Sequence, residues 1–181
     1  MRAVISAFLG VLIWTFFGAT ASEARQWRSN PTDDVLDYAL IQDRRSRNEF
    51  IMIFWINPTI GNEPKNELVR ESLAKNLIIG IAHADFTDRG YFEFRKVSAP
   101  VISTGNGQLR TELKISQQEP LIVRLVPAMQ EIYENAIGPL GKGLTWFVYD
   151  GTGIETCRPG TLIVPYAGEN YSYETPIPGC K

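Results

Sequence analysis

The chain has 181 residues, with 18 Lys and Arg, 20 Asp and Glu and a single histidine, which give a net charge of −2 at pH 7. No stretch is basic enough to indicate binding to nucleic acid or to an anionic membrane. The only two cysteines, Cys157 and Cys180, are too far apart for a C-x-x-C redox motif, so they predict one structural disulfide in an oxidising compartment.

The first 21 residues are predicted to be a secretory signal peptide. A short positive start is followed by an apolar run over residues 3–17 and by small residues up to Ala21, and cleavage is expected after Ala21 or after Ala24. The alternative is a membrane anchor, but a spanning helix needs about 20 apolar residues. We therefore expect a periplasmic or secreted protein with no membrane span after signal removal, a flexible leader over 22–33 and a single β-rich domain over 34–181.

The first half of the domain predicts a central strand and one helix. Residues 34–41 fit either a helix or a strand, and the strand is favoured; the basic loop after it reads as a hairpin. The segment 50–56 is apolar on both faces, so it is expected at the centre of a sheet, covered on both sides. Apolar residues recur at helical spacing over 64–77, which predicts an amphipathic helix.

A second hairpin is predicted directly after this helix. Residues 77–86 have the composition of a strand, and the sequence that follows, from Thr87 to Gly90, is typical of a tight turn. In the returning strand, 91–97, Phe92 and Phe94 face one side and the charged residues between them face the other.

The remaining elements are predicted from turn residues and apolar runs. Gly105-Asn106-Gly107 indicates a hairpin between two weak strands, and residues 128–136 indicate a short helix. Pro127 is expected to end the strand before it, and Pro165 places its own strand at a sheet edge. The further strands are predicted over 121–126, 144–150, 154–157, 161–166 and 171–175.

Many short strands separated by Gly and Pro turns are typical of a two-layered β fold. The predicted fold is mainly β, a two-sheet antiparallel sandwich with one or two short helices and one C-terminal disulfide.

His83 is the only histidine, and on an extended strand its side chain shares a face with that of Asp85. The pair could act as a general base with an orienting carboxylate. A metal site draws on several His or Cys ligands, so no metal or cofactor is predicted. A single strand histidine is more typical of a packed or surface residue, and no residue is assigned a catalytic role.

Other catalytic motifs give no sharper candidate. The chain has no G-x-S-x-G elbow, and the glycine-rich stretch from Gly138 lacks the spacing of a phosphate loop. Carboxylate pairs for sugar hydrolysis cannot be selected from sequence, because the candidates are numerous. They include Glu93, Asp150, Glu155 and Glu174.

Aromatic residues of the C-terminal block are the candidate binding residues. Tyr171 and Tyr173 share one face of a predicted strand, and Trp146 and Tyr149 lie on another. Facing outward together, such rings would form a platform for a protein or a glycan. The alternative is that they pack in the core, which takes most aromatic side chains.

These observations favour a non-enzymatic binding or accessory module that engages a protein partner through an exposed strand edge or an aromatic face. A small secreted hydrolase that uses carboxylates, or His83 with Asp85, is one alternative. A glycan-binding module with outward tyrosines is the other.

Overall fold

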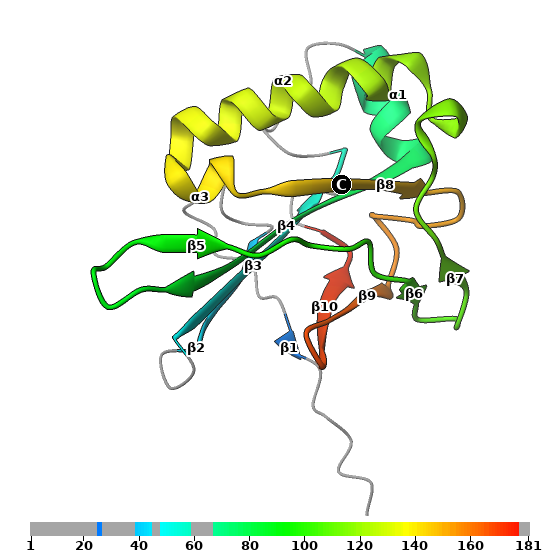
Figure 1. The fold of residues 1–181 in the computed structure, drawn as a ribbon. Helices are drawn as coiled ribbons and strands as arrows, with labels where there is room; N and C mark the ends of the chain where they lie inside the picture. Colours follow the sequence, from blue (N-terminus) through cyan, green and yellow to red (C-terminus); the bar gives the residue numbers. More distant parts are fainter. Residues whose placement is uncertain (1–24, 27–38, 45–47, 59–66, 178–181) are drawn as a thin grey trace, which may run out of the picture.

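The computed structural model describes residues 25–26, 39–44, 48–58 and 67–177 (Figure 1). Over these ranges the chain is mainly β, with two five-stranded sheets and few helices, as predicted. The sheets pack face to face, and helices cover the far side of one of them (Figure 1). We call the sheet that contacts the helices the helix-side sheet and the other one the outer sheet.

The helix-side sheet is built around one long strand. Its strands run in the order β2-β3-β4-β5, and β8 pairs with β4 as well. Strand β4 is 11 residues long, so two shorter strands pair with the same edge of it, one after the other. Strand β8 pairs with residues 76–81 of β4, and β5 pairs with residues 84–86. The strands are β2 (Ala39–Arg44), β3 (Glu49–Ile56), β4 (Asn76–Phe86), β5 (Phe92–Phe94) and β8 (Thr145–Asp150).

The outer sheet has the order β1-β10-β9-β6-β7. Its pairs are antiparallel except for β1 and β10, which run parallel. The strands are β1 (Arg25–Gln26), β6 (Ile102–Thr104), β7 (Leu109–Arg110), β9 (Gly160–Tyr166) and β10 (Glu169–Thr175).

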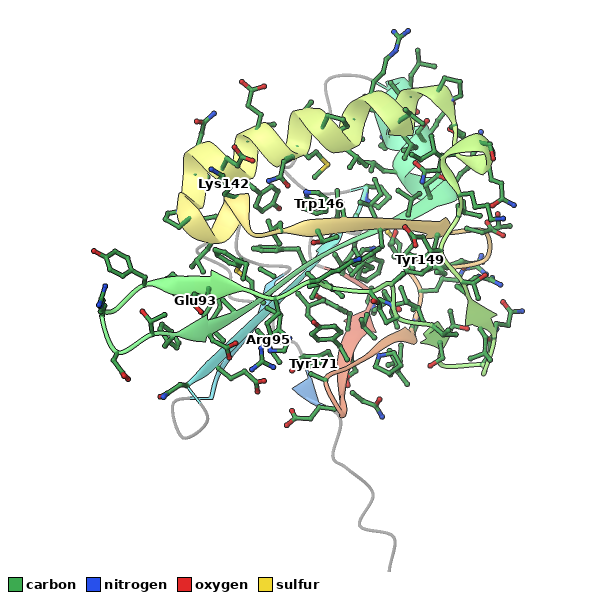
Figure 2. The ribbon with its side chains drawn as sticks, in the orientation of Figure 1. Glu93, Arg95, Lys142, Trp146, Tyr149 and Tyr171 are labelled. Atoms are coloured by element: carbon green, nitrogen blue, oxygen red, sulfur yellow. The ribbon has the colours of Figure 1, made fainter. Side chains whose placement is uncertain are left out.

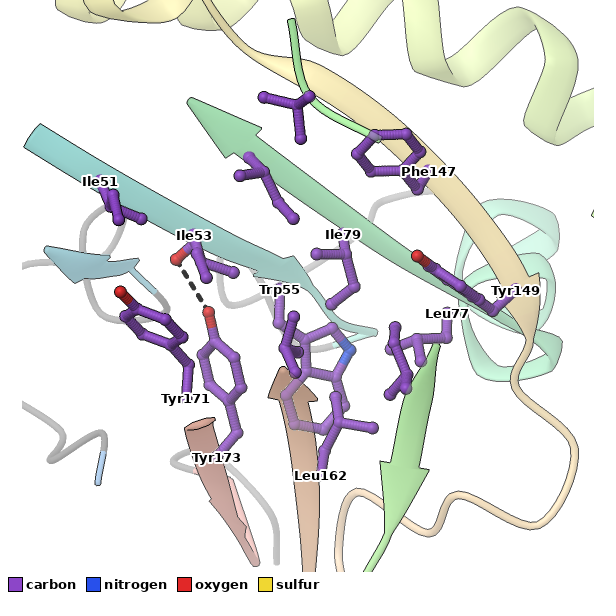
Figure 3. Close-up of a cluster of buried hydrophobic side chains, with 14 of the residues drawn as sticks. Ile51, Ile53, Trp55, Leu77, Ile79, Phe147, Tyr149, Leu162, Tyr171 and Tyr173 are labelled. Carbon is purple, nitrogen blue, oxygen red and sulfur yellow. Dashed lines mark hydrogen bonds between the residues drawn. The ribbon is translucent and has the colours of Figure 1, made fainter. Parts of the chain in front are cut away.

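Two apolar cores follow from the period-two alternation of β3 and β4. Odd-numbered residues of both strands, such as Ile53 and Ile79, face the outer sheet, whereas even-numbered ones, such as Phe54 and Ile78, face the helices. All eight residues of β3 are buried, which confirms the prediction of a central strand covered on both sides. Figure 3 shows the core between the sheets, where the Tyr173 hydroxyl donates a hydrogen bond to the Ile53 carbonyl at 2.8 Å.

The helices are α1 (Glu67–Lys75), the short 3-10 helix η2 (Ile115–Gln117), α2 (Pro120–Ile137) and α3 (Pro139–Lys142). The predicted strand over 121–126 is wrong, because these residues are the first turns of α2. Ile122, Met129 and Tyr133 are buried at helical spacing against the sheet. Pro127 is tolerated inside α2 because it lies on the exposed side, where water can satisfy the carbonyl that loses its N–H partner.

Two further predictions about the C-terminal block are corrected. Residues 154–157 form no strand but lie in consecutive turns that carry the chain from β8 in one sheet to β9 in the other. Strand β9 is not at an edge, since it lies between β10 and β6. Strand β6 pairs only with Leu162 and Ile163, however, so the flank of Pro165 has no neighbouring strand that would need its missing N–H.

Some predictions fall on residues that the structure does not describe. They concern the signal peptide, most of the leader and Cys180, so the Cys157–Cys180 disulfide stays a prediction. Within the described ranges, no helix combines the length and apolar character that crossing a membrane requires.

Candidate functional site: the β4–β5 hairpin

The hairpin formed by the end of β4 and by β5 projects from the body of the helix-side sheet (Figure 1). Period-two alternation gives it two chemically different faces. Odd-numbered residues carry charged side chains on the face toward the outer sheet, and even-numbered residues carry phenylalanines on the face toward the helices. The sequence predicted this alternation, although β5 is shorter than expected.

On the charged face, His83 lies at the centre of a buried hydrogen-bond chain. Its Nε2 is 3.0 Å from Oε1 of Glu49, and its Nδ1 is 2.9 Å from the hydroxyl of Tyr166 on the outer sheet. His83 and Glu49 are only 6% and 8% exposed. Because a carboxylate only accepts, a neutral His83 carries its proton on Nε2 and accepts a hydrogen bond from Tyr166 at Nδ1. Both ring nitrogens are thus engaged by protein groups.

Arg95 extends this chain to the surface. Its guanidinium donates two hydrogen bonds to Asp85, at 2.6 and 2.7 Å, and a third to Glu49 at 3.1 Å. The hydrogen bonds from Arg95 lower the pKa of Asp85, and burial raises the pKa of Tyr166. The carboxylate that hydrogen-bonds to His83 is thus that of Glu49. Asp85, which the sequence paired with His83, is bound by Arg95 instead.

On the opposite face, phenylalanines form a cluster that continues the helix-side core outward. The rings of Phe86 and Phe92 lie 4.8 Å apart, Phe50 lies 6.2 Å from Phe86, and Phe94 stacks on Phe92 at 6.1 Å. Phe50 is buried, whereas Phe94 is 38% exposed. The cluster therefore grades from core to surface along the hairpin, and Tyr91 at its turn is 69% exposed.

The backbone of β5 forms an edge of the helix-side sheet, because β5 is the last strand in the order that the described residues give. Arg95 donates its backbone N–H to the His83 carbonyl at 2.8 Å, so odd-numbered residues bond to β4. Since bonding alternates along an antiparallel strand, the N–H and C=O groups of Phe92 and Phe94 point away from β4. An exposed edge of this kind is a template for pairing with another strand.

The predicted binding residues lie elsewhere. Tyr171, Tyr173 and Tyr149 are 1%, 0% and 0% exposed and belong to the core between the sheets (Figure 3). They pack as the core alternative expected and form no outward platform. Trp146 is partly buried on the helix side, where its Nε1 donates a hydrogen bond to Oε1 of Gln130 at 2.6 Å. Figure 2 shows Trp146 and Tyr149 on β8, away from Glu93 on the hairpin.

Among the hollows lined by described residues, two are sizeable. One of about 330 Å³ lies against the hairpin and is lined by Thr87, Asp88, Arg89, Tyr91 and Glu93. The other, of about 550 Å³, lies where the segment 153–160 meets the turn after β6. In the described part of the chain, no three His, Cys, Asp or Glu side chains are arranged to hold a metal ion.

Sequence reasoning missed Glu49 and Tyr166 as partners of His83. They lie 34 and 83 residues from it in the chain, and only the pairing of the strands and the packing of the sheets bring them together. The alternation of Phe92 and Phe94 with Glu93 and Arg95 was visible in the sequence and marks the same hairpin.

Comparison of the chain with protein-family models, with curated proteins and with solved structures found no match. The geometry of the hairpin therefore carries the functional inference.

Proposed function

We propose that the protein is a non-enzymatic binding or accessory module of the periplasm or the extracellular space, and that it engages a protein partner at the β5 edge. The partner adds an extended segment to this edge by β-augmentation, in which main-chain hydrogen bonds supply affinity and alternate side chains supply specificity. The observation that carries the proposal is the coincidence, on β5, of an open strand edge with a partly buried Phe92 and a Phe94 that is 38% exposed.

The arrangement of the hairpin supports this function over catalysis. Both nitrogens of His83 are occupied by Glu49 and Tyr166, so the histidine cannot act as a base without losing one of these contacts. Phe94, by contrast, offers aromatic surface next to outward backbone groups. Aromatic side chains are frequent anchors at protein interfaces, and an edge strand supplies the register for an added one.

We also infer that the domain is secreted with its signal peptide removed and that Cys157 and Cys180 form a disulfide. The backbone N–H of Ile177 donates to the Thr156 carbonyl at 2.9 Å. This hydrogen bond brings the chain three residues before Cys180 beside the residue that precedes Cys157. Such proximity supports a bridge that would close the C-terminal block.

The proposed function is tested with two substitutions at one position. Phe94→Ala removes the ring, and Phe94→Pro removes the ring and also the outward N–H, which the ladder with β4 does not use. The mature, oxidised protein is cross-linked mildly in the extracytoplasmic fraction of its source, and its captured partner is identified. We expect capture to fall about tenfold with Phe94→Ala, the loss of a typical interface anchor, and further with Phe94→Pro.

Leu109→Pro is the matched control, because Leu109 is 67% exposed on β7, the edge strand of the outer sheet. This variant should capture the partner as well as the unsubstituted protein. Melting temperatures and circular dichroism of all three variants establish that they are folded. Undiminished capture by a folded Phe94→Pro variant would overturn the β5 proposal.

A further inference from the structure

Three carboxylates form a row across the hairpin on its charged face. Glu49 of β3 is directly opposite Asp85 of β4, and Asp85 is directly opposite Glu93 of β5. Directly opposite residues place their side chains on the same face, where like charges destabilise the sheet unless cations compensate them. The neighbouring row supplies a cation, because Arg95 lies directly beside the carboxylates, and His83 in the same row hydrogen-bonds to Glu49.

Compensation reaches only two of the three carboxylates. Glu49 contacts His83 and Arg95, and Asp85 is bound by Arg95 through two hydrogen bonds. Glu93 is exposed and makes no ion pair with any residue in the described ranges. The row therefore ends at the open sheet edge on a carboxylate whose next neighbour would belong to an added strand.

Resting on the proposed function, the geometry points to a particular occupant of this edge: an extended protein segment with Lys or Arg opposite Glu93 and apolar residues opposite Phe92 and Phe94. The outward backbone groups of Phe92 and Phe94 make the hydrogen bonds to this segment, which leaves Glu93 at a non-hydrogen-bonded pair. Side chains are closest at such pairs, with Cα atoms about 4.5 Å apart. The apolar residues of the segment then extend the phenylalanine cluster.

The surroundings of Glu93 have room for a long basic side chain. The hollow of about 330 Å³ is bordered by Glu93, with Asp88, Arg89, Tyr91 and Thr87 as its other walls. Among these groups two carboxylates outnumber one guanidinium, so the balance of charge at neutral pH favours a cation. The aliphatic stem of Lys or Arg can lie along the exposed Tyr91 ring while its charge reaches Glu93.

A second copy of this chain fits the edge less well. In-register antiparallel pairing of two β5 strands about their centres would place Glu93 opposite Glu93, and like charges directly opposite each other are destabilising. Charged residues on an edge strand are a common means of preventing self-association. The row thus disfavours self-pairing and favours a basic segment.

The test uses three acetylated and amidated seven-residue peptides in which threonine and valine flank a central lysine, norleucine or glutamate. Each is titrated into the mature oxidised protein, and the backbone amide resonances of Phe92 and Phe94 are followed by NMR. We expect the lysine peptide to bind about fivefold more tightly than the glutamate peptide, the ratio that a favourable and an unfavourable cross-strand charge pair produce together. Glu93→Gln should abolish this preference, whereas Asp88→Asn, a matched charge change in the turn, should largely keep it.

The outcomes separate the inference from the function beneath it. If none of the three peptides shifts the Phe92 and Phe94 resonances, the β5 edge does not accept a strand and the proposed function fails. If all three bind with equal affinity, or if the preference survives Glu93→Gln, the edge accepts strands but the assignment of a basic segment is overturned. Concentration-dependent shifts without peptide would identify a second copy as the occupant and would also overturn it.

Discussion

The close approach of Trp146 to Gly80 gives the sharpest prediction about the fold. The two residues are directly opposite each other on β8 and β4, and a Cβ atom placed on Gly80 would lie 2.4 Å from Cζ3 of the Trp146 ring. The ring cannot move aside freely, because its Nε1 donates to Gln130 at 2.6 Å and its centroid lies 5.3 Å from that of Tyr133. The absence of a side chain at Gly80 thus makes room for the indole.

Overpacking should make Gly80→Ala cost about 1–3 kcal/mol of the free energy of unfolding. Trp146→Ala should cost about 3 kcal/mol, the lower end for a deleted core aromatic, since the ring is only partly buried. With the ring absent, the new methyl group has space, and Gly80 does not have a positive φ that would disfavour alanine. In that background Gly80→Ala should be neutral or stabilise by about 0.4–1 kcal/mol, because alanine restricts the unfolded chain.

The double variant should therefore be about 1–4 kcal/mol more stable than the sum of the two single effects predicts. Urea unfolding followed by far-ultraviolet circular dichroism measures all four proteins without relying on tryptophan fluorescence, which Trp146→Ala alters. Additive effects, or a Gly80→Ala variant as stable as the parent, would refute the packing of the indole on Gly80. A substitution at Leu109 serves as the control. Gly153→Ala does not, because Gly153 has a φ of 81°, a backbone conformation that strains a residue with a side chain.

Three further predictions concern charge and covalent structure. Arg95 lowers the folded-state pKa of Asp85, so this carboxylate stabilises the fold above its unfolded pKa of about 3.9, and the contribution is lost as the pH falls through the folded pKa. Acid unfolding of Asp85→Asn, followed by circular dichroism, should show a smaller loss of stability over that interval than the parent protein. Burial raises the pKa of Tyr133 to about 12. The neutral hydroxyl therefore contributes to stability below its unfolded pKa of about 10, and this contribution is lost as the pH rises through the folded pKa. Tyr133→Phe should therefore flatten the fall in stability above pH 10. Reduction of the predicted Cys157–Cys180 bridge should lower stability by about 3 kcal/mol, and an unchanged melting temperature in reductant would count against the bridge.

The sequence was most informative where local pattern and tertiary environment agree. The run from Phe50 to Ile56 is apolar on both faces and lies between two apolar cores. The strand after α1 and its return through a tight turn also followed from composition and alternation. In both cases the residues that favour the local structure are the ones that the packing buries, so the pattern could be read without partners.

Prediction failed where a local signal competed with a distant one. Pro127 is a strong stop signal for a strand, but Ile122, Met129 and Tyr133 find a sheet to pack against only in a helix, and that sheet comes from other parts of the chain. The tyrosines of β10 share one face of their strand, a pattern that fits either an outward platform or a core face. They are buried because the helix-side sheet covers the face they share (Figure 3).

The partners of His83 explain how a short edge strand can present a defined surface. Strand β5 pairs with β4 over only three residues, which alone would leave it poorly fixed. Arg95, one residue beyond β5, binds Asp85 on β4 and Glu49 on β3, and His83 joins this cluster to Tyr166 of the outer sheet. This network, which is buried at His83 and Glu49 and partly exposed at Arg95 and Asp85, attaches the hairpin to both sheets. A segment that binds at Phe92 and Phe94 then meets an edge that is already ordered, so less of the binding free energy is lost to fixing the hairpin.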